Sequence, residues 1–110
     1  MNRINYSFIK SNESTMQLPN LEDFSATTRA MGYDAVSIRD WEPNKVIPTH
    51  THEFGVHAIV TQGEMWLTRG GDVEHLQVGD TFTMLPDTPH SEKYGPQGAI
   101  YWAARQFPKA

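Results

Sequence analysis

The chain has 110 residues, enough for one domain with a single core. Its composition is 38% hydrophobic and 20% charged, which excludes wholesale disorder, and no apolar run is long enough to cross a membrane. The lack of cysteine excludes disulfides and thiolate metal ligands, and a formal charge of -4 with no basic run argues against a nucleic-acid partner.

The N-terminal segment, residues 1–17, is predicted to be an arm in front of a single domain spanning residues 18–110. Its first residues lack the apolar core and cleavage site of a secretory signal, so we expect a cytoplasmic protein. Ile4, Tyr6 and Phe8 alternate with polar residues, the period of a half-buried strand. This arm is either a frayed tail or a strand exchanged at a sheet edge with a second subunit, and the second interpretation predicts a homodimer.

One short helix is predicted over residues 21–32. Asn20 is a suitable N-cap, Glu22 and Asp23 lie in the first turn, and Gly32 can end the helix. The side chains that share its apolar stripe are Leu21, Phe24, Thr28 and Met31. We expect this helix to be a structural flap packed on the rest of the domain.

From Tyr33 onward the sequence predicts short strands separated by turns. The turn signals are Pro43-Asn44, Gly63, Gly70-Gly71-Asp72 and Gly79-Asp80. The expected strands cover residues 34–41, 46–52, 56–61, 65–68, 73–78, 81–85, 90–94 and 99–107. With the arm this makes eight or nine closely spaced strands, which predicts an all-β sandwich or barrel of antiparallel strands.

Histidines are concentrated between residues 50 and 57. On a strand His50 and His52 project from the same face, where they can chelate a metal, although such a pair on a surface strand is often only solvated. A further candidate, His90, lies far along the chain, just after a turn set by Pro86 and Pro89. The three imidazoles are therefore candidate ligands for one divalent transition metal.

Together these motifs resemble the two sequence motifs of the cupin superfamily, here His50-x-His52 followed by Gly63, then Gly79-Asp80 followed by Pro86 and Pro89-His90. The resemblance covers residues 41–94 and implies a double-stranded β-helix, the cupin jelly-roll barrel. In that family the first motif supplies two histidines and a glutamate to a metal, and the second motif supplies a third histidine. The stretch His52-Glu53-Phe54 also looks like the sugar-binding arm of AraC-type regulators, without DNA-binding helices after it, so we expect a stand-alone cupin.

One position departs from the cupin pattern. Val56 stands where the family usually has its glutamate, and valine cannot ligate a metal. If the strand after Gly55 shifts by one residue, His57 faces inward and the site has four histidines. If it does not shift, the other three histidines form the site with the remaining positions open to water, and these neutral ligands leave the metal its full charge.

Strand alternation brings further polar groups to the expected site. If His90 faces inward on a regular strand, Glu92 and Tyr94 share its face and are the candidate catalytic residues, with Glu92 as general acid or base. The alternative is that Glu92 lies past the barrel mouth and is solvated. Tyr101 and Arg105 also share one face of the last strand, and alternation alone does not say whether it is the inner face.

Two functions from different classes fit these features. In the first, an iron, zinc, nickel or manganese ion on the histidines orients a small oxygen-containing substrate for dioxygenase, isomerase or lyase chemistry. In the second, the barrel is a non-catalytic module that binds or senses a small molecule, and any metal is structural. Both rest on the cupin resemblance, which does not specify the ligand.

Overall fold

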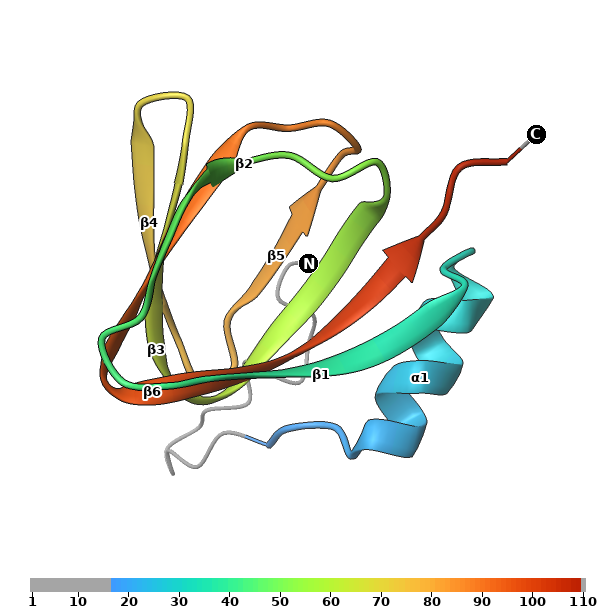
Figure 1. The fold of residues 1–110 in the computed structure, drawn as a ribbon. Helices are drawn as coiled ribbons and strands as arrows, with labels where there is room; N and C mark the ends of the chain where they lie inside the picture. The colour runs from blue at the N-terminus through green and yellow to red at the C-terminus, as the bar shows by residue number, and fades with distance from the viewer. Residues whose placement is uncertain (1–16, 110) are drawn as a thin grey trace.

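The computed structural model describes residues 17–109, which form one helix and six antiparallel strands (Figure 1). The elements are α1 (Leu21–Ala30), β1 (Ala35–Trp41), β2 (Val46–His50), β3 (Gly55–Arg69), β4 (Asp72–Gln77), β5 (Thr81–Met84) and β6 (His90–Gln106). The predicted all-β class with one short helix is therefore confirmed. No helix among residues 17–109 has the length and hydropathy that a bilayer span requires. The predicted arm strand around residues 4–8 lies outside the described residues, and the homodimer and the cytoplasmic location stay predictions.

The described part of the chain has fewer strands than predicted because two expected breaks are bends inside longer strands. β3 continues through Gly63, and β6 continues through residues 95–98, with register shifts between the two strands at these points. The first part of β3 pairs with β5 and with the last part of β6, whereas its second part pairs with β4 and with the first part of β6. β1 and β2 pair with the last and first parts of β6. Two four-stranded halves thus share β3 and β6 and curve around a common interior, the arrangement expected of a jelly-roll barrel (Figure 1).

Gly63 marks the bend where the two long strands come closest. Its φ is +71°, and a Cβ placed there would lie 2.0 Å from the carbonyl oxygen of Gly98. No side chain fits in that space, and only glycine adopts this backbone conformation readily. Gly63, predicted to form a turn, therefore allows close contact between two backbones within a continuous ladder.

α1 begins as predicted. The Asn20 side-chain oxygen accepts a hydrogen bond of 2.7 Å from the backbone N–H of Asp23, which satisfies one of the free donors at the helix start. The helix ends at Ala30, and Gly32 follows with φ +102° in the turn that leads to β1. The backbone N–H of Gly32 donates to the carbonyl oxygen of Arg29, and that of Tyr33 donates to the carbonyl oxygen of Thr28, the hydrogen bonds of a glycine-terminated helix. The predicted start of the helix and the predicted role of Gly32 in ending it are therefore both confirmed.

α1 packs on the outer face of the barrel, beside β1 and β6 (Figure 1). Phe24 and Thr28 are buried, and Phe24 joins Ile59 and Ala104 in a small apolar cluster there. Leu21 and Met31 are 37% and 53% exposed, so the predicted stripe is too long. Only the middle of the helix meets the sheet, and both ends of the stripe extend beyond it.

A separate and larger apolar cluster fills the barrel interior. Its members alternate along the strands and come from β3, β4, β5 and β6, namely Val56, Ala58, Val60, Met65, Leu67, Leu76, Phe82, Met84, Tyr94, Ala99, Tyr101 and Ala103. Polar side chains gather instead where β2 ends and β6 begins, and two of them, His90 and Glu92, are buried. Buried groups of this kind need partners, so this end of the barrel is where a site is to be sought.

Candidate functional site

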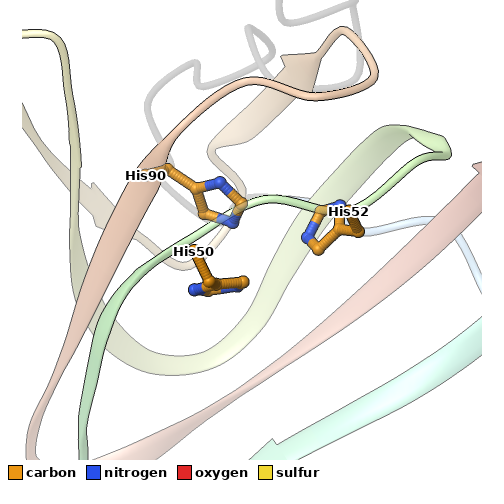
Figure 2. Close-up of side chains that lie close together, drawn as sticks. All are labelled: His50, His52 and His90. Atoms are coloured by element: carbon orange, nitrogen blue, oxygen red, sulfur yellow. The ribbon is translucent and has the colours of Figure 1, made fainter.

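His50, His52 and His90 converge at this end of the barrel (Figure 2). His50 ends β2 and His90 begins β6, and these two residues are directly opposite partners in the antiparallel pair. The ring centroids are 4.3 Å apart for His50 and His90, 4.8 Å for His52 and His90, and 5.4 Å for His50 and His52. One nitrogen of each ring lies within 4.8 Å of the other two. A metal bound at about 2.1 Å from each nitrogen needs them closer still, which rotation of the side chains can supply.

Backbone carbonyls fix the orientation of two of these rings. The Nδ1 atom of His90 lies 2.8 Å from the carbonyl oxygen of Thr88, and the Nδ1 atom of His50 lies 2.9 Å from that of Pro48. A carbonyl oxygen only accepts hydrogen bonds, so Nδ1 carries the proton in both rings. Each Nε2 atom is then left with a free lone pair, which is how proteins prepare histidine for metal binding.

The loop that carries His52 and the turn that precedes His90 are tied together. The backbone N–H of Asp87 donates a 2.8 Å hydrogen bond to the carbonyl oxygen of His52, and the hydroxyl of Thr88 donates one of the same length to the carbonyl oxygen of Leu85. Asp87 has φ +61°, a conformation that aspartate tolerates better than most residues. The turn before His90 is therefore set by hydrogen bonds as well as by the flanking prolines, and it holds His90 beside the loop of His52.

The Nε2 atom of His90 is buried and has no hydrogen-bond partner among residues 17–109. The Oε2 atom of Glu92 is 3.2 Å away without hydrogen-bond geometry, and it is 3.9 Å from the Nε2 atom of His50. A buried polar atom without a partner costs free energy, and a metal ion between the histidines would satisfy this one. With nitrogen ligands, an adjacent carboxylate and no cysteine in the chain, the site suits a divalent transition metal.

His52 differs from the other two histidines in its surroundings. Its ring stacks flat on Phe54, with centroids 4.4 Å apart and planes 2° apart. Burial lowers the pKa of His52, and positive charge on His90 or His50 would lower it further. The neutral form is thereby favoured, and this is the form that ligates a metal.

Glu92 and Tyr94 lie on the inner face of β6 together with His90, as strand alternation predicted. Glu92 is only 8% exposed, so it is not the solvated residue of the alternative interpretation. Its Oε1 atom accepts a hydrogen bond from the Tyr94 hydroxyl, while its Oε2 atom faces the histidines. Tyr94 is fully buried and stacks on Trp41, with centroids 5.2 Å apart. Burial raises the pKa of Tyr94, so this hydroxyl stays protonated and donates to Glu92.

A cavity of about 130 Å³ opens beside these groups. Its lining residues come from every strand except β4 and from the loop after β2, and they are Arg39, Trp41, Ile47, His50, His52, Phe54, Val56, Phe82, Met84, His90, Glu92, Tyr101, Ala103 and Arg105. Tyr94 is not among them and lies behind Glu92. The apolar walls with a few polar groups at one side are typical of a small-molecule site.

Two arginines in this lining were not identified as site residues from the sequence. Arg105 shares its face with Tyr101, and the cavity shows that this face is the inner one. Arg39 pairs directly with Tyr101 across the β1–β6 ladder and so points the same way. Only this register, which connects residues far apart in the sequence, could have identified Arg39.

The structure does not bring His57 to the other three histidines. Val56 lines the cavity, so the strand has not shifted, and His57 lies on the opposite face of β3. There it is half-buried against α1, 6.1 Å from the ring of Phe24, and its Nδ1 atom is 3.1 Å from the hydroxyl of Thr83. His75 is exposed on β4, as expected, where it stacks on Trp66.

Comparison with solved structures finds the cupin fold at low sequence identity. KdgF from Halomonas sp. superposes with a TM-score of 0.61 at 19% identity, over 67% of this chain and 68% of that chain. An RmlC-like cupin from Shewanella frigidimarina gives 0.57 at 21% identity, over 67% and 68%. A DMSP lyase gives 0.60 at 18% identity, over 64% of this chain, which spans only 37% of the lyase chain.

These identities show the fold and leave the activity open. No curated protein sequence is significantly similar to this chain. A family model does match, that of the AraC-like ligand-binding domain, over residues 35–107. This range runs from β1 to the end of β6 and so includes all the strands of the described residues and the three converging histidines. The chain is a small cupin, and it belongs to the AraC-like ligand-binding domain family.

Proposed function

We propose that this protein is a metal-dependent enzyme whose His50, His52 and His90 hold one divalent transition metal beside a small cavity. The observation that carries the proposal is the buried Nε2 atom of His90, which has no hydrogen-bond partner among residues 17–109 and lies next to two other imidazoles. A bare histidine cluster on a surface would not need a ligand. Here the arrangement costs free energy unless something binds the nitrogen.

A metal at this place supplies Lewis acidity or, in the case of iron, a site for dioxygen chemistry. Three neutral ligands leave its positive charge uncompensated, and that charge is available to polarise an oxygen atom of a substrate. The chain itself supplies Glu92, whose Oε2 atom faces the cavity and can take or give a proton. Tyr94 would act as a positioning residue, because its hydroxyl holds the Oε1 atom of Glu92 and so orients the carboxyl group.

Dioxygenase, isomerase and lyase reactions all suit this combination of a Lewis acid and a carboxylate base. The likeness to a DMSP lyase supports the lyase option, since it gives one example of that reaction class among structures of similar fold. The expected substrate is small, because the cavity of about 130 Å³ is well below the roughly 300 Å³ at which pockets for drug-sized ligands begin. It is expected to contain oxygen, because an oxygen atom is the group that the metal would polarise.

The second candidate is a non-catalytic module that binds or senses a small molecule. The match to the AraC-like ligand-binding domain supports it, since that description names binding and no reaction. The two candidates differ in the role of Glu92. The enzyme needs the carboxyl group of Glu92 to transfer a proton, whereas a binding module still binds its ligand without that transfer.

The test is metal content by mass spectrometry on protein purified without a histidine tag, together with the variants His50→Ala and His90→Ala. We expect close to one equivalent of iron, zinc, nickel or manganese, lost in both variants. His57→Ala is the matched control and should keep the metal. Protein that takes up no metal even after reconstitution, while remaining folded, would rule out the metalloenzyme and leave the binding module.

A further variant, Glu92→Gln, separates the carboxylate from the ligand set. If Glu92 only transfers protons, the variant keeps its metal and loses turnover of whatever substrate is found. Loss of metal in this variant would instead make Glu92 a fourth ligand and remove it as acid or base.

A further inference from the structure

Two arginine side chains line the same cavity as the histidines. Arg39 comes from β1 and Arg105 from the end of β6. In the β1–β6 ladder Arg39 is opposite Tyr101, so the two arginines are anchored four residues apart along β6, about 13 Å at roughly 3.3 Å per residue. The inward residue between them is Ala103, whose short side chain leaves space in the wall.

Neither guanidinium has a carboxylate or hydrogen-bond partner among residues 17–109. Instead each is stacked on an aromatic ring that also lines the cavity. The Cζ atom of Arg39 is 5.1 Å from the ring centre of Trp41, and that of Arg105 is 4.8 Å from the ring centre of Phe54. Both arginines are half-buried. Aromatic stacking holds a guanidinium in place but leaves its N–H donors unused.

The charges around the cavity do not balance. Besides the histidines, its charged lining groups are the two arginines and a single carboxylate, Glu92. The oxygens of Glu92 are already directed to Tyr94 and to the histidines rather than to the arginines. A divalent metal would add two further positive charges. This excess of positive charge favours a negatively charged ligand.

We propose that the cavity selects small organic acids, with the ligand's carboxylate held by Arg39 and Arg105. The planar guanidinium group matches a carboxylate through paired hydrogen bonds, which a lysine cannot reproduce. The inference rests on the proposed function in placing this ligand at the metal site, and it adds the class of ligand. The small volume restricts the acid to a few carbon atoms.

The experiment compares acids with their uncharged amides on the full-length chain. Propionate and succinate are titrated against propionamide and succinamide at constant ionic strength, with binding followed by saturation-transfer NMR and calorimetry. We expect the acids to bind about tenfold or more tightly than the amides, the value of one charge-assisted hydrogen bond. Equal binding of acid and amide, or no binding of any acid to the wild-type chain, would overturn the proposal.

Variants test whether the two arginines are responsible. Arg39→Gln and Arg105→Gln should each weaken acid binding about tenfold or more, while the lysine variants at these positions recover only part of it. Arg29→Gln, at an exposed position of α1, is the matched control and should bind like the wild type. Thermal melting by circular dichroism establishes that each variant is folded. Unchanged binding in folded Arg39→Gln and Arg105→Gln would overturn the proposal.

Parallel titrations of metal-free and metal-loaded protein separate this inference from the proposed function. Acid binding that depends on the arginines but occurs in a protein unable to hold metal would support the anion site and refute the metalloenzyme. A protein that holds one equivalent of metal but does not distinguish acids from amides would support the metal site and refute the anion site.

Discussion

His57 and the three clustered histidines occupy opposite faces of the same barrel wall. His50, His52 and His90 line the cavity, and one nitrogen of each ring lies within 4.8 Å of the other two. His57 instead packs beside the rings of Phe24 and Tyr33, on the side of the sheet that α1 covers. Sequence distance does not separate them, since His57 is closer to His52 than His90 is. What decides the difference is strand alternation and the partner that each face meets. The same residue type joins a polar cluster on the inner face and packs against aromatic rings on the outer one.

The largest effect is expected from the outer face, where packing is tight. Truncating Phe24, which is 3% exposed, to alanine should lower the free energy of unfolding by about 3–5 kcal/mol, because the cavity left beneath α1 cannot collapse fully. Urea denaturation followed by circular dichroism measures this. Leu21→Ala, on the exposed end of the same helix, is the control and should cost about 1 kcal/mol or less. A similar loss in both variants would mean that α1 is not anchored through Phe24.

The next effect distinguishes the two kinds of histidine by metal affinity. His52→Ala should weaken metal binding by about 100-fold or more. Loss of a residue that merely hydrogen-bonds to a metal ligand typically weakens binding by about 10- to 100-fold, and loss of a ligand itself should cost at least as much. His57→Ala should leave the affinity unchanged. Competition with a chromophoric chelator gives both values. Weakened binding in His57→Ala with intact folding would show that the outer face communicates with the site.

A smaller effect concerns the acid stability of the metal-free protein. Burial lowers the pKa of His57 below its ordinary value of 6.5 in the folded state, so the unfolded chain binds the proton more readily. The stabilisation due to neutral His57 is therefore complete above pH 6.5 and is lost as the pH falls toward the lower, folded-state pKa. His57→Gln should flatten the dependence of unfolding free energy on pH in this range. An equally steep dependence in the variant would contradict the assignment.

The smallest effect is expected at His75. Its Nε2 atom is 2.8 Å from the Oε1 atom of Glu64, and both side chains are substantially exposed. Exposed polar contacts of this kind contribute about 0–1 kcal/mol, so His75→Ala should change the unfolding free energy within that range and leave metal content untouched. A larger loss would indicate that stacking on Trp66 matters more than the contact with Glu64.

The sequence was most informative where short-range alternation sufficed. Alternation along a strand predicted that His50 and His52 would share a face, and that Glu92 and Tyr94 would follow His90 inward. Both predictions depend only on neighbouring residues. The meeting of His90 with His50 and His52 is different, because it joins segments 40 residues apart, and it was predicted from the cupin resemblance.

The sequence was least informative where contacts between distant parts of the backbone decide the structure. Gly63 looks like a turn residue, yet it lies within β3 because the carbonyl of Gly98 approaches it. On β1 the apolar residue Ile38 is 53% exposed while Arg39 faces the cavity, the reverse of the usual pattern. Because the inward side chain here is charged, hydrophobicity alone would assign Arg39 to the outer face. The side of β3 on which His57 falls likewise depends on pairing with β5 and β6.

The direct pairing of His50 with His90 across β2 and β6 also bears on how the molecule folds. These residues are separated by most of the barrel, and contacts of such sequence separation form late and slowly. The complete ligand set therefore exists only after the barrel has closed. A metal that binds these histidines would therefore leave the rate of folding nearly unchanged and would slow unfolding instead. Its contribution would be to the lifetime of the folded barrel and not to the speed of its formation.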